Sequence, residues 1–408
     1  MRMLGNIHTI RFGLLISIFA GLAGAAAEPA INGEVSDLGP CRQLTVWGTP
    51  QEMGYAHGYH FAERIESIVD HRASFIGQTS EATYDQIVDA MIPRIQISKR
   101  TRAELAGMLE GMAARLQREP LIKSANRPMR IDDLIFRNSE DMIRGLACSG
   151  FTVWDERAGD AGVLTARNFD YAVRDVENLG AWMILVRKPQ GKKQVATITF
   201  PCYLGAFTGF SSEGVCAFMH DGSGGRDQRV PKAIPLALLL KDLLEDASAE
   251  DALELAEKTL RTGTPSPFPY MARIISPVAS HEGRPVRVFR VDGAGLGENP
   301  VGNSFCVTTN HYLSDQFTAP PGTHPWSTSR YAKLSSSLNE PVSMEACWAR
   351  LDSVSIATSR LATLHSLVVA PRSKQAWVGF AQPGGDVQSA TKTEPLRITF
   401  DKLFGAQQ

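Results

Sequence analysis

Two stretches, Cys148–Thr152 (CSGFT) and Ala166–Tyr171 (ARNFDY), stand where a helical pattern in the sequence gives way to a strand pattern. A Gly-Asp pair at 159–160 is a turn signal, so we expect two antiparallel strands joined there. Such a pairing brings Arg167 and Asp170 back beside the cysteine. A thiol next to a cation and a carboxylate fits a nucleophile, because the cation favours the thiolate. The alternative is a buried cysteine with a surface Arg–Asp pair.

The segment before this cysteine, Pro50–Gly145, has the apolar spacing of helices, most clearly over Leu105–Leu116. Glu119–Arg130 contains two prolines and several charges, which predicts a surface link. Helical spacing resumes over Ile131–Arg144, and Gly145 is the expected C-cap of that helix.

The segment after the cysteine is rich in short runs of β-branched and aromatic residues, which predict strands. We expect the first five runs to be consecutive strands of one antiparallel sheet: Ser149–Trp154, Val163–Arg167, Ala181–Arg187, Val195–Phe200 and Val215–Met219. A helical pair over Pro235–Leu260 follows. The later expected elements are strands at Val286–Val291, Phe305–Thr309, Leu364–Val369, Ala376–Phe380 and Leu396–Phe400, and a helix at Met344–Leu351. Strands, helices and strands in this order predict an α+β fold.

Residues 1–27 have the pattern of a secretory signal peptide. Arg2 and Arg11 accompany an apolar run, Phe12–Ala27, that ends in an A-x-A motif, and no acidic residue precedes Glu28. The alternative is an uncleaved anchor, which is disfavoured because about 20 apolar residues are needed to span a bilayer. The sequence contains no N-x-[ST] sequon. We therefore expect a bacterial protein that is secreted or periplasmic, with no stable membrane insertion.

Charge and cysteine content limit the partners and the redox state. The 42 basic and 43 acidic residues nearly cancel, so no nucleic-acid partner is expected. Six cysteines in an oxidising compartment suit either three disulfides or buried free thiols. If Cys148 is a free nucleophile, at most two disulfides can form among the others.

Two weaker patterns do not carry chemistry. His57-x-x-His60-x-x-Glu63 lacks the H-E-x-x-H spacing of zinc proteases, and steps of three and six residues drift off one helix face. Gly209–Gly214 misses the G-x-S-x-G nucleophile elbow by one residue. We expect no metal and no cofactor.

Five further stretches join the two quoted above to form a recognisable series: Gly54–Gly58, Tyr203–Phe210, Thr309–His311, Ser327–Arg330 and Thr363–Pro371. Together they resemble the cysteine N-terminal nucleophile hydrolases, specifically the acyl-CoA:6-aminopenicillanate acyltransferase family, with similarity to acid ceramidase and choloylglycine hydrolases. The resemblance implies a four-layer αββα fold with a helical N-terminal segment. It also implies self-cleavage between Ala147 and Cys148, giving a helical chain 28–147 and a catalytic chain 148–408 within one hydrolase domain.

The resemblance also assigns roles to individual side chains. Cys148 would be the nucleophile, and its α-amino group, freed by cleavage, would be the base. Asp170 would orient this α-amino group, and Arg167 would lie beside the thiolate. Asn310 would donate to the tetrahedral oxyanion, and Arg330 would complete the charged network.

His220 and Asp221 mark a departure, because the family carries asparagine where this chain has His220. Both are candidates for a second oxyanion or substrate contact. The expected activity is hydrolysis or transfer of a linear N-acyl amide through an acyl-thioester on Cys148. Alternatives are a ceramidase-like lipid amidase, a phospholipase B-like esterase, or a processed but non-catalytic binding protein. The substrate would be a small N-acyl or lipid amide, and the processed chains would remain associated.

Overall fold

The strand-rich part of the chain begins with the pair of strands that the sequence predicts. The computed structural model describes residues 30–142, 147–172, 181–222, 230–279, 282–358, 360–382 and 387–405. In it β5 (Ala147–Trp154) pairs antiparallel with β6 (Val163–Ala172), with Cys148 opposite Phe169. Two short 3₁₀ turns, Asp155–Arg157 and Gly159–Ala161, join the strands. The predicted pairing and its turn are confirmed.

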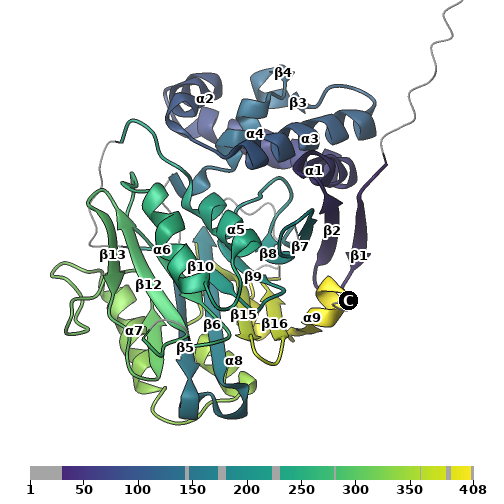
Figure 1. Ribbon diagram of the computed structural model, residues 1–408. Helices are drawn as coiled ribbons and strands as arrows, with labels where there is room; N and C mark the ends of the chain where they lie inside the picture. Colours follow the sequence, from purple (N-terminus) through teal and green to yellow (C-terminus); the bar gives the residue numbers. More distant parts are fainter. Residues whose placement is uncertain are drawn as a thin grey trace, which may run out of the picture. The chain divides into compact units, whose positions relative to one another are not determined.

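This pair lies within a six-stranded antiparallel sheet of order β14-β5-β6-β15-β16-β17 (Figure 1). The other members are β14 (Phe305–Thr308), β15 (Leu361–Ala370), β16 (Gln375–Phe380) and β17 (Leu396–Thr399). Strands from the end of the chain therefore flank the strands that carry the quoted motifs, and β15 pairs directly with β6.

A second sheet has nine strands in the order β1-β2-β7-β8-β9-β10-β11-β12-β13. Their bounds are Gly33–Asp37, Arg42–Gly48, Met183–Pro189, Val195–Thr199, Thr208–Ser211, Cys216–Asp221, Tyr270–Ile275, Val286–Asp292 and Gly295–Asn299. All neighbours are antiparallel except β2 and β7, which pair in parallel. This parallel pair joins the segment before Cys148 to the segment after it.

The expectation that the first five runs form one sheet is wrong. β5 and β6 belong to the six-stranded sheet, whereas β7, β8 and β10 belong to the nine-stranded one. The physical reason is that strands in this core are buried on both faces, as the continuous burial of β5 and β7 shows. Such strands lack the polar alternation that would reveal which neighbour they take.

The two sheets pack face to face and are covered by helices on their outer sides. Helices α5 (Leu236–Asp246) and α6 (Ala252–Thr262) contact the nine-stranded sheet, and α7 (Pro325–Ser336) and α8 (Met344–Ser353) contact the six-stranded one (Figure 1). Along β5, Cys148 and Trp154 lie in the core between the sheets, while Phe151 and Val153 lie in the core beneath α7 and α8. This alternation completes a four-layer αββα arrangement, so the predicted fold class is confirmed.

The N-terminal segment is helical. Its helices are α1 (Pro50–Thr79), α2 (Tyr84–Met91), α3 (Lys99–Leu116) and α4 (Ile131–Arg137). Glycines bring the backbones of α1 and α3 into contact: a Cβ on Gly58 would lie 1.9 Å from the carbonyl oxygen of Met108, and one on Gly111 would lie 2.0 Å from that of Tyr55. The quoted Gly54–Gly58 stretch is thus a helix-packing device.

Two local predictions in this segment need correction. The link Glu119–Arg130 contains a small hairpin of β3 (Leu121–Ile122) and β4 (Arg127–Pro128), and Ile122 is fully buried. The last helix ends at Arg137 rather than Arg144, because the Asn138 side-chain amide donates to the carbonyl oxygens of Leu134 and Cys202.

Some predictions fall outside the described residues. These are the signal peptide at 1–27 and the helix C-cap at Gly145. Among the residues that are described, no helix combines the length and apolar character needed to cross a membrane. Residues 31–408 form one compact unit.

Candidate active site

Cys148 lies near the start of β5, on the face that looks toward the nine-stranded sheet, and is fully buried. Its sulfur is 3.0 Å from the Nη2 atom of Arg167 and 3.6 Å from the carbonyl oxygen of Met219 on β10. The thiol is therefore held between the sheets, with a cation on one side and a backbone acceptor on the other.

Arg167 is fixed by contacts from both sheets. Besides the thiol, its guanidinium donates to the carbonyl oxygen of Met219 at 2.6 Å and to that of Phe207. It is fully buried and stands on β6 opposite Gly150. The predicted placement of this cation beside Cys148 is what the structure has.

A second network connects the backbone of Cys148 to Asp170. The Cys148 amide nitrogen donates to Oδ1 of Asn310 at 3.0 Å. Arg330 donates to the Cys148 carbonyl oxygen at 2.9 Å, to Oδ1 of Asn310 at 2.7 Å and to Oδ2 of Asp170 at 2.6 Å. Four residues predicted from separate parts of the sequence thus meet at one point.

The details of this network differ from the assigned roles. The nitrogen that would become the α-amino group is bound by Asn310, and Asp170 reaches Cys148 through Arg330. The Asn310 amide nitrogen, expected to face an oxyanion, donates to the carbonyl oxygen of Asp221 at 3.3 Å. Direct orientation by Asp170 and oxyanion binding by Asn310 stay predictions.

Several partners of these residues were not singled out from the sequence. Thr363 donates to Oδ1 of Asp170 at 2.6 Å, and the Ser327 hydroxyl accepts from the backbone N–H of Asn310 at 2.8 Å. Ser327 also lies 2.8 Å from Nδ1 of His311. Thr363, Ser327 and His311 all lie within quoted stretches, and Thr363 stands directly opposite Asp170 in the β15–β6 register. A correct pairing of β6 with β15 would have identified Thr363.

Burial controls the ionisation of the thiol. It raises the pKa of Cys148 above the ordinary value, while Arg167 lowers the pKa and Asp170 raises it. The effect of Arg167, which was expected to favour the thiolate, is therefore outweighed by burial in this structure, in which β5 runs through both Ala147 and Cys148. Burial likewise raises the pKa of Asp170, against the opposing effects of Arg330 and Thr363. The continuous chain thus holds a protonated thiol.

His220 and Asp221 lie at the end of β10. The His220 ring is fully buried, and neither of its nitrogens has a hydrogen-bond partner in the described part of the protein. Burial, together with Arg167, Arg273 and Arg330, lowers its pKa well below the ordinary value. Asp221 contributes its backbone carbonyl to Asn310.

The His57, His60 and Glu63 side chains have unrelated partners. Nε2 of His57 accepts from the Cys202 amide at 3.3 Å, and burial lowers the His57 pKa to about 3. Nε2 of His60 lies 3.1 Å from the Gly33 carbonyl oxygen, and Glu63 is exposed beside Arg115. Within the described ranges, no group of three ligand-type side chains could hold a metal ion.

All six cysteines are free thiols and all are buried. The disulfide alternative is therefore wrong for this structure. Burial raises the pKa of Cys41, Cys202 and Cys347 to about 12 in each case. These thiols are poor nucleophiles, because the thiolate is the reactive form.

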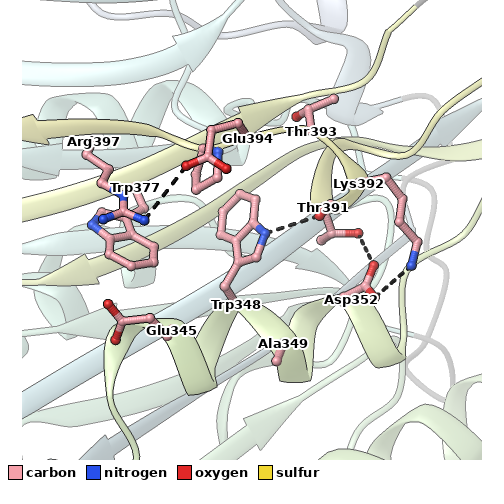
Figure 2. A pocket seen from close by; sticks show the side chains of 11 residues that line it. Glu345, Trp348, Ala349, Asp352, Trp377, Thr391, Lys392, Thr393, Glu394 and Arg397 are labelled. Atoms are coloured by element: carbon pink, nitrogen blue, oxygen red, sulfur yellow. Dashed lines mark hydrogen bonds and ion pairs between the residues drawn. The ribbon is translucent and has the colours of Figure 1, made fainter.

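A surface depression elsewhere on the protein has a volume of about 410 Å³ and lies between α8 and the end of the six-stranded sheet (Figure 2). Four of its charged groups form two pairs: Lys392 with Asp352 at 2.8 Å, and Arg397 with Glu394 at 3.7 Å. None of the predicted site residues lines it. We therefore assign it no part in the chemistry.

Among known protein families, no family model matches the chain. An uncharacterized protein of Archaeoglobus fulgidus is 22% identical over 242 residues, which is 50% of this chain and 38% of that protein. The chain thus matches less than half the length of this relative.

Three solved structures illustrate the structural matches. The first is a Caenorhabditis elegans ortholog of N-acylethanolamine-hydrolyzing acid amidase (TM-score 0.41, 16% identity, 55% of this chain and 93% of that one). The second is a mutant of the conjugated bile acid hydrolase from Clostridium perfringens (0.43, 13%, 64% and 95%). The third is penicillin V acylase from Agrobacterium tumefaciens (0.35, 17%, 60% and 87%).

Proposed function

We propose that this protein is a self-processing cysteine amidohydrolase or acyltransferase that cleaves a linear N-acyl amide through an acyl-thioester on Cys148. The observation that carries the proposal is the surroundings of this one residue. Its sulfur contacts Arg167 at 3.0 Å, its nitrogen contacts Asn310 at 3.0 Å and its carbonyl oxygen contacts Arg330 at 2.9 Å. A cysteine whose side chain and backbone are both fixed by functional groups suits a nucleophile that also supplies its own base.

The first step is cleavage of the chain. The Cys148 sulfur attacks the carbonyl carbon of Ala147, the thiol proton passes to the Cys148 nitrogen, and a thioester replaces the peptide bond. The carbon–nitrogen bond breaks at this point and frees the α-amino group of Cys148. Water then hydrolyses the thioester, which releases the Ala147 carboxylate and the Cys148 thiol. The segments 28–147 and 148–408 then form two chains that remain associated. Their association is supported by the parallel β2–β7 pairing and by a buried contact of Glu104 with Arg187.

The second step acts on the substrate. The free α-amino group, whose pKa is about 7.7–8.0 when unperturbed, accepts the thiol proton. Sulfur attacks the acyl carbon, the departing amine takes the proton, and the acyl group stays on Cys148 as a thioester. Water completes hydrolysis, or an acceptor amine completes transfer. Arg167 stabilises the thiolate, and Arg330 with Asp170 holds the Cys148 backbone in place.

The sequence also motivates a proposal about the setting. The pattern of residues 1–27 supports export to the periplasm or exterior. The substrate class extends to lipid amides, in which case the protein is a ceramidase-like amidase. A phospholipase B-like esterase is the alternative enzyme. A non-catalytic binding protein is the outcome that the following experiments separate from the proposal.

Denaturing mass spectrometry of the purified protein tests the proposal first. We expect two masses, the larger of a chain that starts at Cys148, and a single intact mass for Cys148→Ala, which should also lack all amidase activity. Cys347→Ala removes another fully buried thiol, from the core beneath α7 and α8, and is the matched control. It should cleave as the wild type does.

Alkylation then separates an enzyme from a binding protein. Iodoacetamide should label Cys148 stoichiometrically in the two-chain protein and only slowly in uncleaved protein, because the buried thiol is protonated there. A single intact chain in active protein would refute self-cleavage. Two chains with an inert Cys148 would instead indicate a binding protein.

A further inference from the structure

His220 lies on the face of β10 that looks toward the sheet carrying the nucleophile. Side chains alternate along a strand, so His220 shares a face of β10 with Phe218. The guanidinium carbon of Arg167 lies 5.9 Å from the centre of the Phe218 ring, which places this face toward the six-stranded sheet. The carbonyl oxygen of Met219, the residue before His220, is 3.6 Å from the Cys148 sulfur.

The ring of His220 is an unsatisfied polar group in the interior. It is fully buried, and both ring nitrogens lack a partner among the described residues. Buried polar groups in folded proteins nearly always have partners, so an exception calls for an explanation. The other fully buried histidine between the sheets, His365, lacks a partner only at Nδ1, since its Nε2 lies 2.8 Å from the Thr208 hydroxyl. A partner that is absent from the protein alone would explain the difference.

The charges around His220 determine its form. Arg167, Arg273 and Arg330 surround it, and all three are buried. Asp170 is hydrogen-bonded to Arg330. Burial and the three cations lower the His220 pKa, so the ring is neutral at physiological pH. A neutral imidazole keeps one N–H donor and does not add a fourth positive charge.

We propose that His220 donates a hydrogen bond from its neutral ring to the acyl oxygen of the substrate, and to the oxyanion that forms there when the Cys148 sulfur attacks. This inference rests on the proposed function and deepens it. As the sulfur–carbon bond forms, the carbonyl π pair moves to oxygen and His220 stabilises the new charge without transferring a proton. When the oxyanion collapses, the carbon–nitrogen bond breaks and the amine takes its proton from the α-ammonium group.

The structure favours a donor over the two other roles open to a histidine. A base would have to become an imidazolium among three arginines, which their charges oppose. A structural histidine would have at least one partner within the protein, as His365 has through Nε2. One N–H of the Asn310 side-chain amide donates to the Asp221 carbonyl oxygen, whereas both nitrogens of the His220 ring lack a partner among the described residues.

Turnover of N-acyl aminomethylcoumarin amides, from acetyl to palmitoyl, tests the inference. His220→Leu removes the donor at similar volume, and His220→Asn and His220→Gln return an N–H donor. Each variant is first checked for two chains by mass spectrometry and for stoichiometric alkylation of Cys148. His57→Gln, at a buried histidine that only accepts from the Cys202 amide, is the control.

We expect His220→Leu to cleave itself and to alkylate as the wild type does, yet to lose about 100-fold in kcat. Asn or Gln should recover at least about tenfold of this loss, and KM should change little. His57→Gln should turn over normally. A processed His220→Leu with wild-type kcat, or equal losses in all three His220 variants, would overturn the oxyanion role while leaving the proposed function intact. A wild-type protein that is two-chain but inert toward every amide and toward iodoacetamide would overturn the proposed function itself.

Discussion

Two fully buried arginines, Arg187 and Arg167, occupy opposite kinds of environment. Arg187 on β7 donates to Oε1 of Glu245 at 2.9 Å and to Oε2 of Glu104 at 2.7 Å. Arg167 on β6 has no carboxylate within hydrogen-bond distance in the described structure and donates instead to two carbonyl oxygens and the Cys148 sulfur. The charge of Arg187 is balanced by two carboxylates, whereas Arg167 can balance a negative charge that forms on a neighbouring group.

The pKa directions follow this difference. Burial lowers the pKa of both arginines. Glu104 and Glu245 reverse the effect for Arg187, whose pKa is raised, whereas the pKa of Arg167 stays lowered. A buried charge that is fully paired serves structure, because either partner alone would be costly in the interior. A buried charge left without a counterion favours a negative charge beside it, and here that place belongs to the Cys148 sulfur.

The largest expected effect on the free energy of unfolding comes from replacing Arg187 in its cluster with Glu104 and Glu245. Arg187→Met leaves the buried Glu104 with Lys241 at 4.0 Å and the buried Glu245 with Arg100 at 3.4 Å in place of their short contacts to Arg187, and should cost about 3–5 kcal/mol in the free energy of unfolding. Urea denaturation of the full-length protein measures this. The exposed pair Arg261–Glu257 offers a control, and Arg261→Met should cost less than about 0.5 kcal/mol. Equal losses in both variants would contradict the structural role of the buried cluster.

Replacing Arg167 should affect the reactivity of Cys148 more than the free energy of unfolding. Arg167→Met leaves the carbonyl oxygens of Phe207 and Met219 without this donor, which should cost about 1–3 kcal/mol. The Cys148 pKa should rise, and alkylation by iodoacetamide at neutral pH should slow by about tenfold for each unit of that rise. The rate of alkylation against pH measures the shift. An unchanged pH profile would mean that Arg167 does not stabilise the thiolate.

A third test concerns a buried carboxyl, Asp141, which has no ion pair with any of the described residues. Burial raises the pKa of Asp141 to about 7, although the Ala237 amide donates to it at 3.0 Å. The folded state therefore binds a proton that the unfolded chain releases above about pH 4, so stability should fall as pH rises toward 7. This is the smallest expected effect, since it appears only as a slope of the free energy of unfolding against pH. Asp141→Asn should flatten the slope in urea denaturation between about pH 4.5 and about pH 7.5, and an unchanged slope would assign it to another group.

The sequence predicts local pairing well and distant pairing poorly. Cys148, Arg167 and Asp170 were placed near one another correctly, because one turn joins β5 to β6. The period of two puts Arg167 on the same face as Cys148 and Asp170 on the other face, where it reaches the Cys148 backbone through Arg330. The division of strands between two sheets was missed, because strands buried on both faces carry no polar alternation. Thr363 was missed for a related reason: it is 193 residues from Asp170, and only the β15–β6 register brings them together. The Met219 and Phe207 carbonyls that hold Arg167 are backbone atoms, which no side-chain pattern reports.

The parallel pairing of β2 with β7 has a consequence for reversibility. In the continuous chain this ladder joins two parts of one molecule, so refolding after denaturation is unimolecular. Under the proposed cleavage, the same ladder joins two polypeptides, and refolding requires them to meet in solution. The processed protein would then depend on concentration to refold, while the broken peptide bond could not be restored. Its persistence would rest on a slow rate of unfolding rather than on a reversible equilibrium.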